Sequence, residues 1–405
     1  MSSVGDGSHG PDPLPRPRPR AVDPTGPTAL VVWDPEFRAY DFGPDHPFTE
    51  RSRELAVRLF ERSLDGRERS QVAWVRSVDP ASVATLRNFH DERYLDFVRR
   101  VGDGGEAVYL DRGDTPGFPG CYDAAGRIVT GAVRAAEWAW EHGRPAFHPA
   151  GGLHHARADR ASGFCVLNDL AVAISRLVSA GRRVAYLDID AHHGDGVMYG
   201  FYRSGRVLDI DFHQDGRTLF PGTGFPNESG GGDGAGLKVN VPLPPGAGDE
   251  ALLPLFRRLV RPLLESFRPE MIVLQHGVDA HAGDPLAQLQ YTPAAYEEID
   301  RTVVRLSGEL CDGRLLVTGG GGYRMESVAR VLARTGRIVA GLTAPGADDP
   351  VPVAWREEFF EEAGYLAPER WAETERLLPT VWGPSDEERL IEELQERLGT
   401  RFRRP

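Results

Sequence analysis

Short, largely apolar segments separated by longer helical stretches are the feature that most constrains how this chain can fold. The apolar segments are residues 29–33, 184–189, 207–212, 271–275 and 315–318. The stretches with a helical repeat are residues 128–142, 167–180, 250–267 and 293–310. Strands that are apolar along their length are buried on both faces, as in a parallel sheet covered by helices. The sequence therefore predicts an α/β fold, a three-layer αβα sandwich around a central, mostly parallel sheet.

Clusters of polar side chains follow four of these predicted strands. They lie at residues 188–195, at His213, at 276–284 and at 319–323. Ligands of an open parallel sheet bind outside the carboxyl ends of its strands. We therefore expect the four clusters to converge on one active site at that edge of the sheet.

The densest cluster contains Asp188, Asp190 and His192 at alternate positions, where the apolar segment 184–189 ends. Side chains on a strand alternate between faces, so these three should project to one side. Asp190 and His192 are then placed to bind one metal ion, with Asp188 behind them. The alternative is a helix-capping aspartate followed by surface histidines.

A third carboxylate, Asp279, follows the predicted strand 271–275. Two ligands from one loop and a third from a distant loop leave the fourth position of a catalytic zinc site open for water. Taken alone, this region is explained equally well as a polar turn ending in Asp284-Pro285.

Two further motifs carry candidate catalytic side chains. His154 and His155 follow two glycines, where two imidazoles can lie near a reacting water, although a His-His pair taken alone is more often incidental. Tyr323 follows four glycines that lack the lysine of a phosphate-binding loop, and its phenol can donate a hydrogen bond to a developing oxyanion. Phe164 and Phe220 can wall a narrow channel. For Tyr323 and for each phenylalanine, packing is the alternative interpretation.

Composition narrows the class of protein. The formal net charge of −13 argues against a nucleic-acid-binding surface, which needs an excess of basic residues. Three scattered cysteines form neither a disulfide framework nor a zinc ribbon, which favours a reducing cytoplasm. The sequence has no apolar run of about 18 residues and no basic-then-apolar start, so we expect neither a membrane span nor a signal peptide.

The two ends of the chain differ from its middle. Residues 1–27, rich in proline and arginine, predict a disordered tail. Residues 346–405 predict a helical C-terminal extension that ends in an amphipathic helix, with Ser385 and Glu388 as its capping box and Gly399 as its stop. That helix should pack on its own domain or on a partner chain, so an oligomer through this extension is one expectation.

Taken together and in order, these motifs resemble a known family. The chain is similar, over about residues 28–345, to the zinc-dependent histone deacetylases of the arginase/deacetylase superfamily, a branch that includes bacterial acetoin-utilisation deacetylases. The strings that carry the resemblance are GGLHHARADRASGFCVLND (151–169), AYLDIDAHHGDG (185–196), LFPGTG (219–224), VLQHGVDAHAGDP (273–285) and GGGGY (319–323).

The resemblance implies the arginase/deacetylase fold, a deacetylase catalytic domain at 28–345, and a role for each matching residue. Asp190, His192 and Asp279 would bind zinc, with iron(II) as an alternative. The catalytic group would be His154 and His155, oriented by Asp188 and Asp195, together with Tyr323. The substrate tunnel would be lined by Gly163, Phe164, Phe220 and Leu286. A structural potassium or sodium ion would lie near Asp188, Asp190, His192 and Asp211, although relatives commonly have a serine in place of Asp211.

The implied reaction is hydrolysis of the acetamide of acetyl-lysine, in a protein or a small substrate, to a free amine and acetate. Acetylpolyamine hydrolysis uses the same residues and is the main alternative. A binuclear manganese ureohydrolase would need carboxylates at Gly194 and His281, which this chain lacks. A catalytically inactive, deacetylase-like binding protein would lack a metal ligand or the tyrosine, and the chain has all of them.

Overall fold

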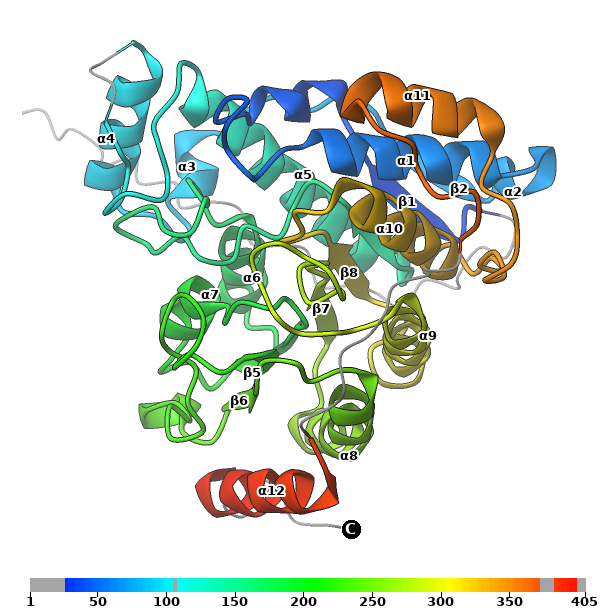
Figure 1. Ribbon diagram of the computed structural model, residues 1–405. Helices are drawn as coiled ribbons and strands as arrows, with labels where there is room; N and C mark the ends of the chain where they lie inside the picture. Colours follow the sequence, from blue (N-terminus) through cyan, green and yellow to red (C-terminus); the bar gives the residue numbers. More distant parts are fainter. Residues whose placement is uncertain (1–25, 105–107, 372–381, 399–405) are drawn as a thin grey trace, which may run out of the picture.

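An eight-stranded sheet runs through the centre of the molecule, and every pair of neighbouring strands is parallel (Figure 1). The computed structural model describes residues 26–104, 108–371 and 382–398. The strands are β1 (Ala29–Val32), β2 (Val72–Val75), β3 (Ala146–His148), β4 (Val184–Asp188), β5 (Val207–Gln214), β6 (Lys238–Leu243), β7 (Met271–Gln275) and β8 (Leu315–Thr318). Their order across the sheet is β2-β1-β3-β8-β7-β4-β5-β6.

Helices cover both faces of this sheet. They are α1 (Arg51–Ser63), α2 (Gly66–Ser70), α3 (Val83–Leu86), α4 (Glu92–Gly102), α5 (Cys121–His142), α6 (Asp169–Ser179), α7 (Asp195–Gly200), α8 (Asp249–Phe267), α9 (Pro293–Leu310), α10 (Met325–Val339), α11 (Val353–Ala363) and α12 (Pro384–Leu398). Side chains at alternate positions of a strand pack into two separate hydrophobic cores. Leu187 belongs to the core shared with α1, α8, α9 and α10, whereas its neighbour Tyr186 belongs to the core shared with α4, α5 and α6. The predicted three-layer αβα sandwich is confirmed.

Sequence patterns identified five of the eight strands. The missed strands are β2, β3 and β6. β3 spans only three residues, too few for a recognisable apolar run. β6 alternates apolar residues with Lys238 and Asn240 and contains Pro242, which a strand at the edge of a sheet tolerates. The helix predicted from residue 128 begins at Cys121. Its first turns contain Gly126, which packs closely against Pro80 and Ala81 and weakens the helical pattern in the sequence.

The described part of the C-terminal extension folds back onto the domain. The apolar stripe of α12, which includes Leu390 and Leu394, is buried against the core that contains α8. Because α12 also contacts β6, it covers one edge of the sheet. The predicted capping box at Ser385 is wrong: the helix begins one residue earlier, at Pro384, a residue type favoured at the first helical position. Gly399 and residues 1–25 of the predicted tail lie outside the described residues.

The four central strands, β3, β8, β7 and β4, bring the polar motifs together. His148 ends β3 and is followed by the loop of His154; Thr318 ends β8 before the glycines; Gln275 ends β7 before Asp279; and Asp188 ends β4. These strands are neighbours and run in the same direction, so their carboxyl ends meet at one edge. Within the described ranges, no helix is long and apolar enough to cross a membrane.

Candidate active site

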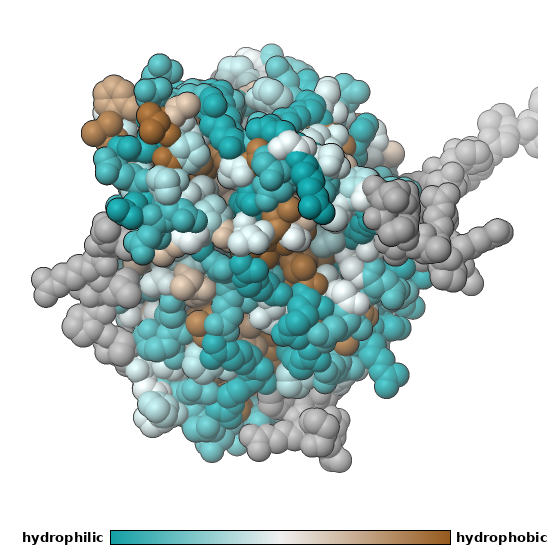
Figure 2. Space-filling model, turned by 90° about the vertical axis from the view of Figure 1, so that its right-hand side faces the viewer, coloured by the Kyte–Doolittle hydropathy of each residue, from teal (hydrophilic) through white to brown (hydrophobic). Residues whose placement is uncertain are grey.

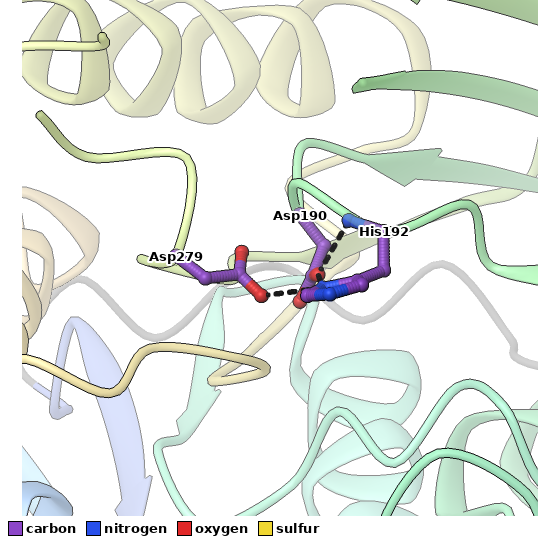
Figure 3. Close-up of side chains that lie close together, drawn as sticks. All are labelled: Asp190, His192 and Asp279. Carbon is purple, nitrogen blue, oxygen red and sulfur yellow. Dashed lines mark hydrogen bonds and ion pairs between the residues drawn. The ribbon is translucent and has the colours of Figure 1, made fainter. Parts of the chain in front are cut away.

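Asp190, His192 and Asp279 form one buried cluster at this edge (Figure 3). Each offers one ligand atom, and these atoms lie within 4.8 Å of one another. Nδ1 of His192 faces both carboxylates, 2.8 Å from Asp279 Oδ2 and 3.2 Å from Asp190 Oδ1. The cluster arises because Asp190 and His192 follow β4, while Asp279 follows its neighbour β7.

Neighbouring donors hold the two carboxylates in place. Asp190 Oδ2 accepts hydrogen bonds from Gln275 Nε2 and from the Gly321 amide, each at 2.7 Å. Asp279 Oδ1 accepts one from the Ala191 amide at 2.7 Å. Donors of this kind fix the orientation of ligands around a metal.

The charges of the cluster fit a divalent cation. Burial raises the pKa of Asp279 to about 7, and the charge of Asp190 adds to that rise. Burial alone lowers the pKa of His192, but its hydrogen bonds to the two carboxylates outweigh this effect and raise it to about 10. One imidazole and two carboxylates are donors that suit zinc or iron(II), and three protein ligands leave a coordination position open.

Gly321 is required because the two carboxylates lie too close to its backbone to leave room for a side chain, and not because its backbone needs an unusual conformation. A Cβ atom at this position would overlap Asp279 Oδ2 and come within 2.9 Å of Asp190 Oδ2. Only glycine therefore lets the loop after β8 pass directly over the two carboxylates.

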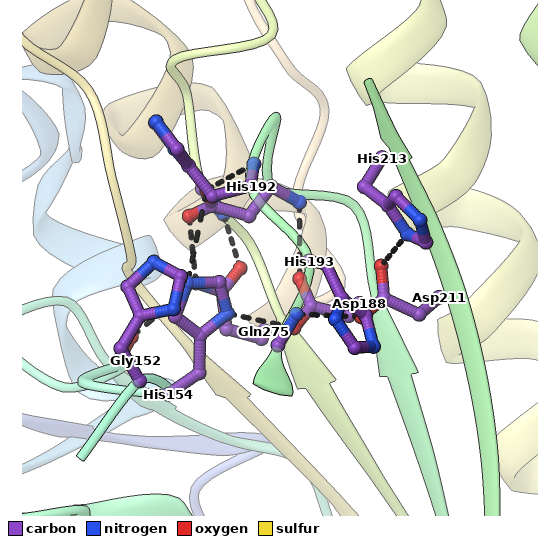
Figure 4. Close-up of polar contacts among 12 residues, drawn as sticks. Gly152, His154, Asp188, His192, His193, Asp211, His213 and Gln275 are labelled. Carbon is purple, nitrogen blue, oxygen red and sulfur yellow. Dashed lines mark hydrogen bonds and ion pairs between the residues drawn. The ribbon is translucent and has the colours of Figure 1, made fainter. Parts of the chain in front are cut away.

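The paired histidines lie next to the cluster, each backed by its own carboxylate. Figure 4 shows the first pair, His154 with Asp188. Nδ1 of His154 donates to Asp188 Oδ2 at 2.8 Å, and Nδ1 of His155 donates to Asp195 Oδ1 at 2.8 Å. Their Nε2 atoms lie 3.1 Å apart. Asp188 also accepts a hydrogen bond from the hydroxyl of Tyr186 at 2.5 Å.

The two histidines differ in protonation. Burial lowers the pKa of His154, but the nearby charges of Asp188 and Asp190 outweigh it and raise the value to about 10. Burial and the positive charge of His154 lower the pKa of His155 to about 4. The raised pKa favours the protonated form of His154, and the lowered pKa favours the neutral form of His155.

Tyr323 is held by its backbone rather than by its hydroxyl. Its amide donates to Asp284 Oδ2 at 2.9 Å, and its ring centroid lies 6.5 Å from that of His192. Arg53 donates to the carbonyl oxygens of Gly320 and Gly322, which fixes the loop that precedes the tyrosine. Arg53 was not predicted as part of the site, and Asp284 was predicted only within the polar cluster 276–284, without a role of its own.

Two of the predicted tunnel residues, Phe220 and Phe164, lie beside His155 and Tyr323. The ring centroid of Phe220 lies 5.1 Å from that of His155, and that of Phe164 lies 6.0 Å from that of Tyr323. Gly163 has a φ of 52°, and a Cβ there would come within 2.5 Å of His155 and 2.8 Å of Phe220. Leu286 is half-buried beyond Asp284, which accepts its amide hydrogen bond.

Asp211 lies behind Asp188 on the neighbouring strand (Figure 4). One of its oxygens accepts a hydrogen bond from the Gly194 amide at 2.7 Å, and the other accepts one from Nδ1 of His213 at 2.7 Å. Both oxygens of the residue that replaces the common serine are thus already bonded within the protein.

A cavity of about 740 Å³ lies apart from this cluster. It is bordered by α9 and by the segment after α10, and its lining includes Tyr291, Arg334 and Trp371. Figure 2 shows this side of the molecule, where apolar surface lies in a hollow between polar side chains. A smaller cavity of about 240 Å³ is lined by Gly322 and Tyr323.

A histone deacetylase domain matches residues 46–339 of the chain. The chain belongs to the histone deacetylase family. It is 35% identical over 364 residues to the acetoin utilization protein AcuC of Bacillus subtilis (strain 168), covering 87% of this chain and 92% of the relative. It is 35% identical over 301 residues to a probable deacetylase of Archaeoglobus fulgidus, covering 73% and 81%. It is 38% identical over 261 residues to histone deacetylase B of Dictyostelium discoideum, covering 62% and 60%.

Family membership makes this protein a deacetylase, and therefore a hydrolase, of the bacterial acetoin-utilisation type. The family is generally metal-dependent, and the buried Asp190, His192 and Asp279 cluster of this chain could hold a metal ion.

Proposed function

We propose that this protein hydrolyses the acetamide of acetyl-lysine, in a protein or a small substrate, to a free amine and acetate. The observation that carries the proposal is the joint placement of one buried His-and-two-Asp cluster, a pair of His–Asp dyads and a tyrosine at one sheet edge. Zinc is the proposed metal and iron(II) the alternative; when bound, it polarises the amide carbonyl and lowers the pKa of water.

The remaining steps use side chains of the chain itself. Neutral His155 accepts a proton through Nε2 as the oxygen of water attacks the carbonyl carbon. The hydroxyl of Tyr323 donates a hydrogen bond to the carbonyl oxygen as its negative charge develops. The C–N bond then breaks, His155 returns its proton to the leaving nitrogen, and acetate and the amine depart. His154, already positive, stabilises the same negative charge.

The substrate stem would lie between Phe164 and Phe220, with Gly163 and Leu286 completing the wall. Two aromatic faces suit an extended methylene chain, and they carry no charge that would select its far end. A potassium or sodium ion beside Asp188, Asp190 and His192 is part of the proposal. Asp211 would contribute to it only through lone pairs that Gly194 and His213 do not use.

We propose a cytoplasmic location, which is supported by three cysteines that are all unpaired and buried. The proposed partners are acetylated lysine or an acetylated small amine, without nucleic acid and without a membrane. The apolar stripe of α12 contacts its own chain, so an oligomer would need another part of the C-terminal extension.

The test compares acetyl-lysine peptides with acetylpolyamines on enzyme loaded with a single defined metal. We expect a higher kcat/KM for acetyl-lysine, and we expect Tyr323→Phe to lower the rate on either substrate. A strong preference for acetylpolyamines would show that acetylpolyamines, and not acetyl-lysine, are the substrate class. Hydrolysis of neither would leave the inactive binding protein as the explanation.

A further inference from the structure

The carboxylate behind His155 is also held from its other side, by an arginine. Asp195 Oδ1 accepts the hydrogen bond from His155, while Asp195 Oδ2 accepts two from Arg157, at 3.0 Å from Nε and 2.5 Å from Nη2. The Asp195 side chain is 4% exposed. Two charge-assisted hydrogen bonds from one rigid guanidinium group hold that oxygen in a fixed position. The direction from which Asp195 holds the imidazole of His155 therefore depends on Arg157.

Arg157 is itself fixed by neighbours outside the dyad. Its guanidinium carbon lies 4.2 Å from the ring centroid of Tyr199, in α7, a distance that allows a cation–π interaction. The hydroxyl of Tyr199 donates to Glu228. Glu228 in turn accepts hydrogen bonds from the amides of Gly224, at 2.7 Å, and Phe225, at 2.8 Å. These contacts connect His155 to the loop that also carries Phe220.

The second dyad is built differently. Asp188 accepts hydrogen bonds from the Tyr186 hydroxyl and from the Asp190 amide, which are neutral donors. Asp211 lies beside it on the neighbouring strand. An arginine therefore holds the carboxylate behind the histidine that acts as the base in the proposed reaction, whereas the Tyr186 hydroxyl and the Asp190 amide hold the carboxylate behind the other histidine.

We propose that Arg157 is a positioning residue for the hydrolysis: it holds Asp195 so that Asp195 keeps Nε2 of His155 aimed at the reacting water. This inference rests on the proposed function, in which His155 transfers the proton. It adds to that function a residue that touches neither the metal ligands nor the substrate walls.

The test uses Arg157→Met, Arg157→Lys and a matched control, Arg160→Met. Arg160 lies in the same loop, its side chain is 56% exposed, and its guanidinium contacts only the neighbouring Asp159 carboxylate among the ion pairs found. For Arg157→Met we expect kcat to fall about 10- to 100-fold, the usual effect of removing an outer-shell partner. KM for an acetyl-lysine peptide, metal content and melting temperature should match the wild type, because the tunnel and ligands are unchanged.

Rescue experiments separate positioning from a structural role. Arg157→Lys should recover part of kcat, since lysine restores the charge but not the rigid planar donor. Millimolar guanidine added to Arg157→Gly should also recover part of it. An unchanged kcat in Arg157→Met would overturn the inference. A raised KM, a lower metal content or a lower melting temperature in Arg157→Met would also overturn it, since Arg157 would then act on binding or folding.

A separate measurement keeps this inference apart from the proposed function. An inactive wild type would overturn the function itself, whereas an active wild type with an unaffected Arg157→Met would overturn only the role of Arg157. In either case the Nδ1–H signal of His155 can be followed by nitrogen-15 NMR and assigned by its loss in His155→Gln. We expect this signal to exchange with water faster in Arg157→Met than in Arg160→Met; equal exchange in the two variants would contradict the positioning role.

Discussion

Nε2 of His154 lies 3.1 Å from Nε2 of His155, although the carboxylates behind the two imidazoles have opposite surroundings. Asp188, behind His154, lies among other carboxylates, whereas Asp195, behind His155, is paired with Arg157. The charges of Asp188 and Asp190 raise the pKa of His154 to about 10, whereas burial and the charge of His154 lower that of His155 to about 4. These pKa values divide the pair into one imidazole that holds its proton and one that is able to accept a proton.

This division predicts unequal effects of mutation. His155→Gln should lower kcat by about 100- to 10,000-fold, the usual contribution of a general acid–base group. His154→Gln should have the smaller effect, because it removes a charge and not the proton acceptor. Steady-state kinetics on metal-loaded protein would check this. A larger loss in His154→Gln would reverse the assignment.

Removing the tyrosine hydroxyl should affect the reaction but not the metal site. We expect Tyr323→Phe to lower kcat by about 100- to 1,000-fold, as for the loss of one oxyanion donor. Its amide bond to Asp284 and the packing of its ring against Phe164 should persist. Metal content measured alongside kcat gives the control. Normal activity in this variant would remove Tyr323 from the mechanism.

A single methyl group on the glycine loop should damage the metal site. In Gly321→Ala the new Cβ would overlap Asp279 Oδ2, so we expect loss of bound metal and of activity together. Gly308→Ala is the matched control, since a Cβ there meets nothing within 4 Å and the residue lies inside α9. That change should stabilise the protein by about 0.5–1 kcal/mol. Unaltered metal binding in Gly321→Ala would show that the loop is not held close to the carboxylates.

Glu50 should make stability depend on pH. Its side chain is buried, and neither carboxylate oxygen has a hydrogen-bond partner among the described residues. Burial raises its pKa from the ordinary 4.5 to about 8, although the charge of Arg53 opposes the rise. Between these values the folded protein binds one proton more than the unfolded chain. Its stability should therefore fall as pH rises, by about 1.4 kcal/mol per pH unit from this group.

Glu50→Gln should remove this part of the dependence. Urea unfolding of both proteins at pH 5.5 and 7.5 would measure it, with the variant gaining stability relative to the wild type as pH rises. Parallel pH dependence of the two proteins would show that Glu50 is ionised in the folded state.

The fold was predictable because its signals are local. Segments such as residues 271–275 and 315–318 are apolar along their whole length, and the structure has strands at both. Strand alternation predicted Asp190 and His192 together, although both lie in the loop after β4, and Asp279 was predicted from its position after a strand. The sequence pattern does not show that β4 and β7 are neighbours. This pairing brings the three side chains within reach of one ion.

The residues that hold the site from behind, such as Arg53 and Arg157, could not be predicted, because their contacts are with residues distant in the sequence. Arg53 reaches the carbonyl of Gly320 across 267 residues of sequence, and Arg157 reaches Asp195 across 38. Neither arginine has a local motif that distinguishes it from the many others in the chain. Gln275 ends a predicted strand, yet an amide there carries no sign that its side chain donates to Asp190.

The central claim is that one metal ion, held by Asp190, His192 and Asp279, is required for release of acetate from acetyl-lysine. The direct measurement titrates metal-free protein with zinc while recording bound metal per chain and acetate released from an acetyl-lysine peptide, with Asp279→Asn as the control. We predict that activity rises in proportion to occupancy and reaches its maximum at one ion per chain, and that Asp279→Asn neither retains the ion nor releases acetate. Acetate release by the metal-free protein, or full activity in Asp279→Asn, would contradict the account.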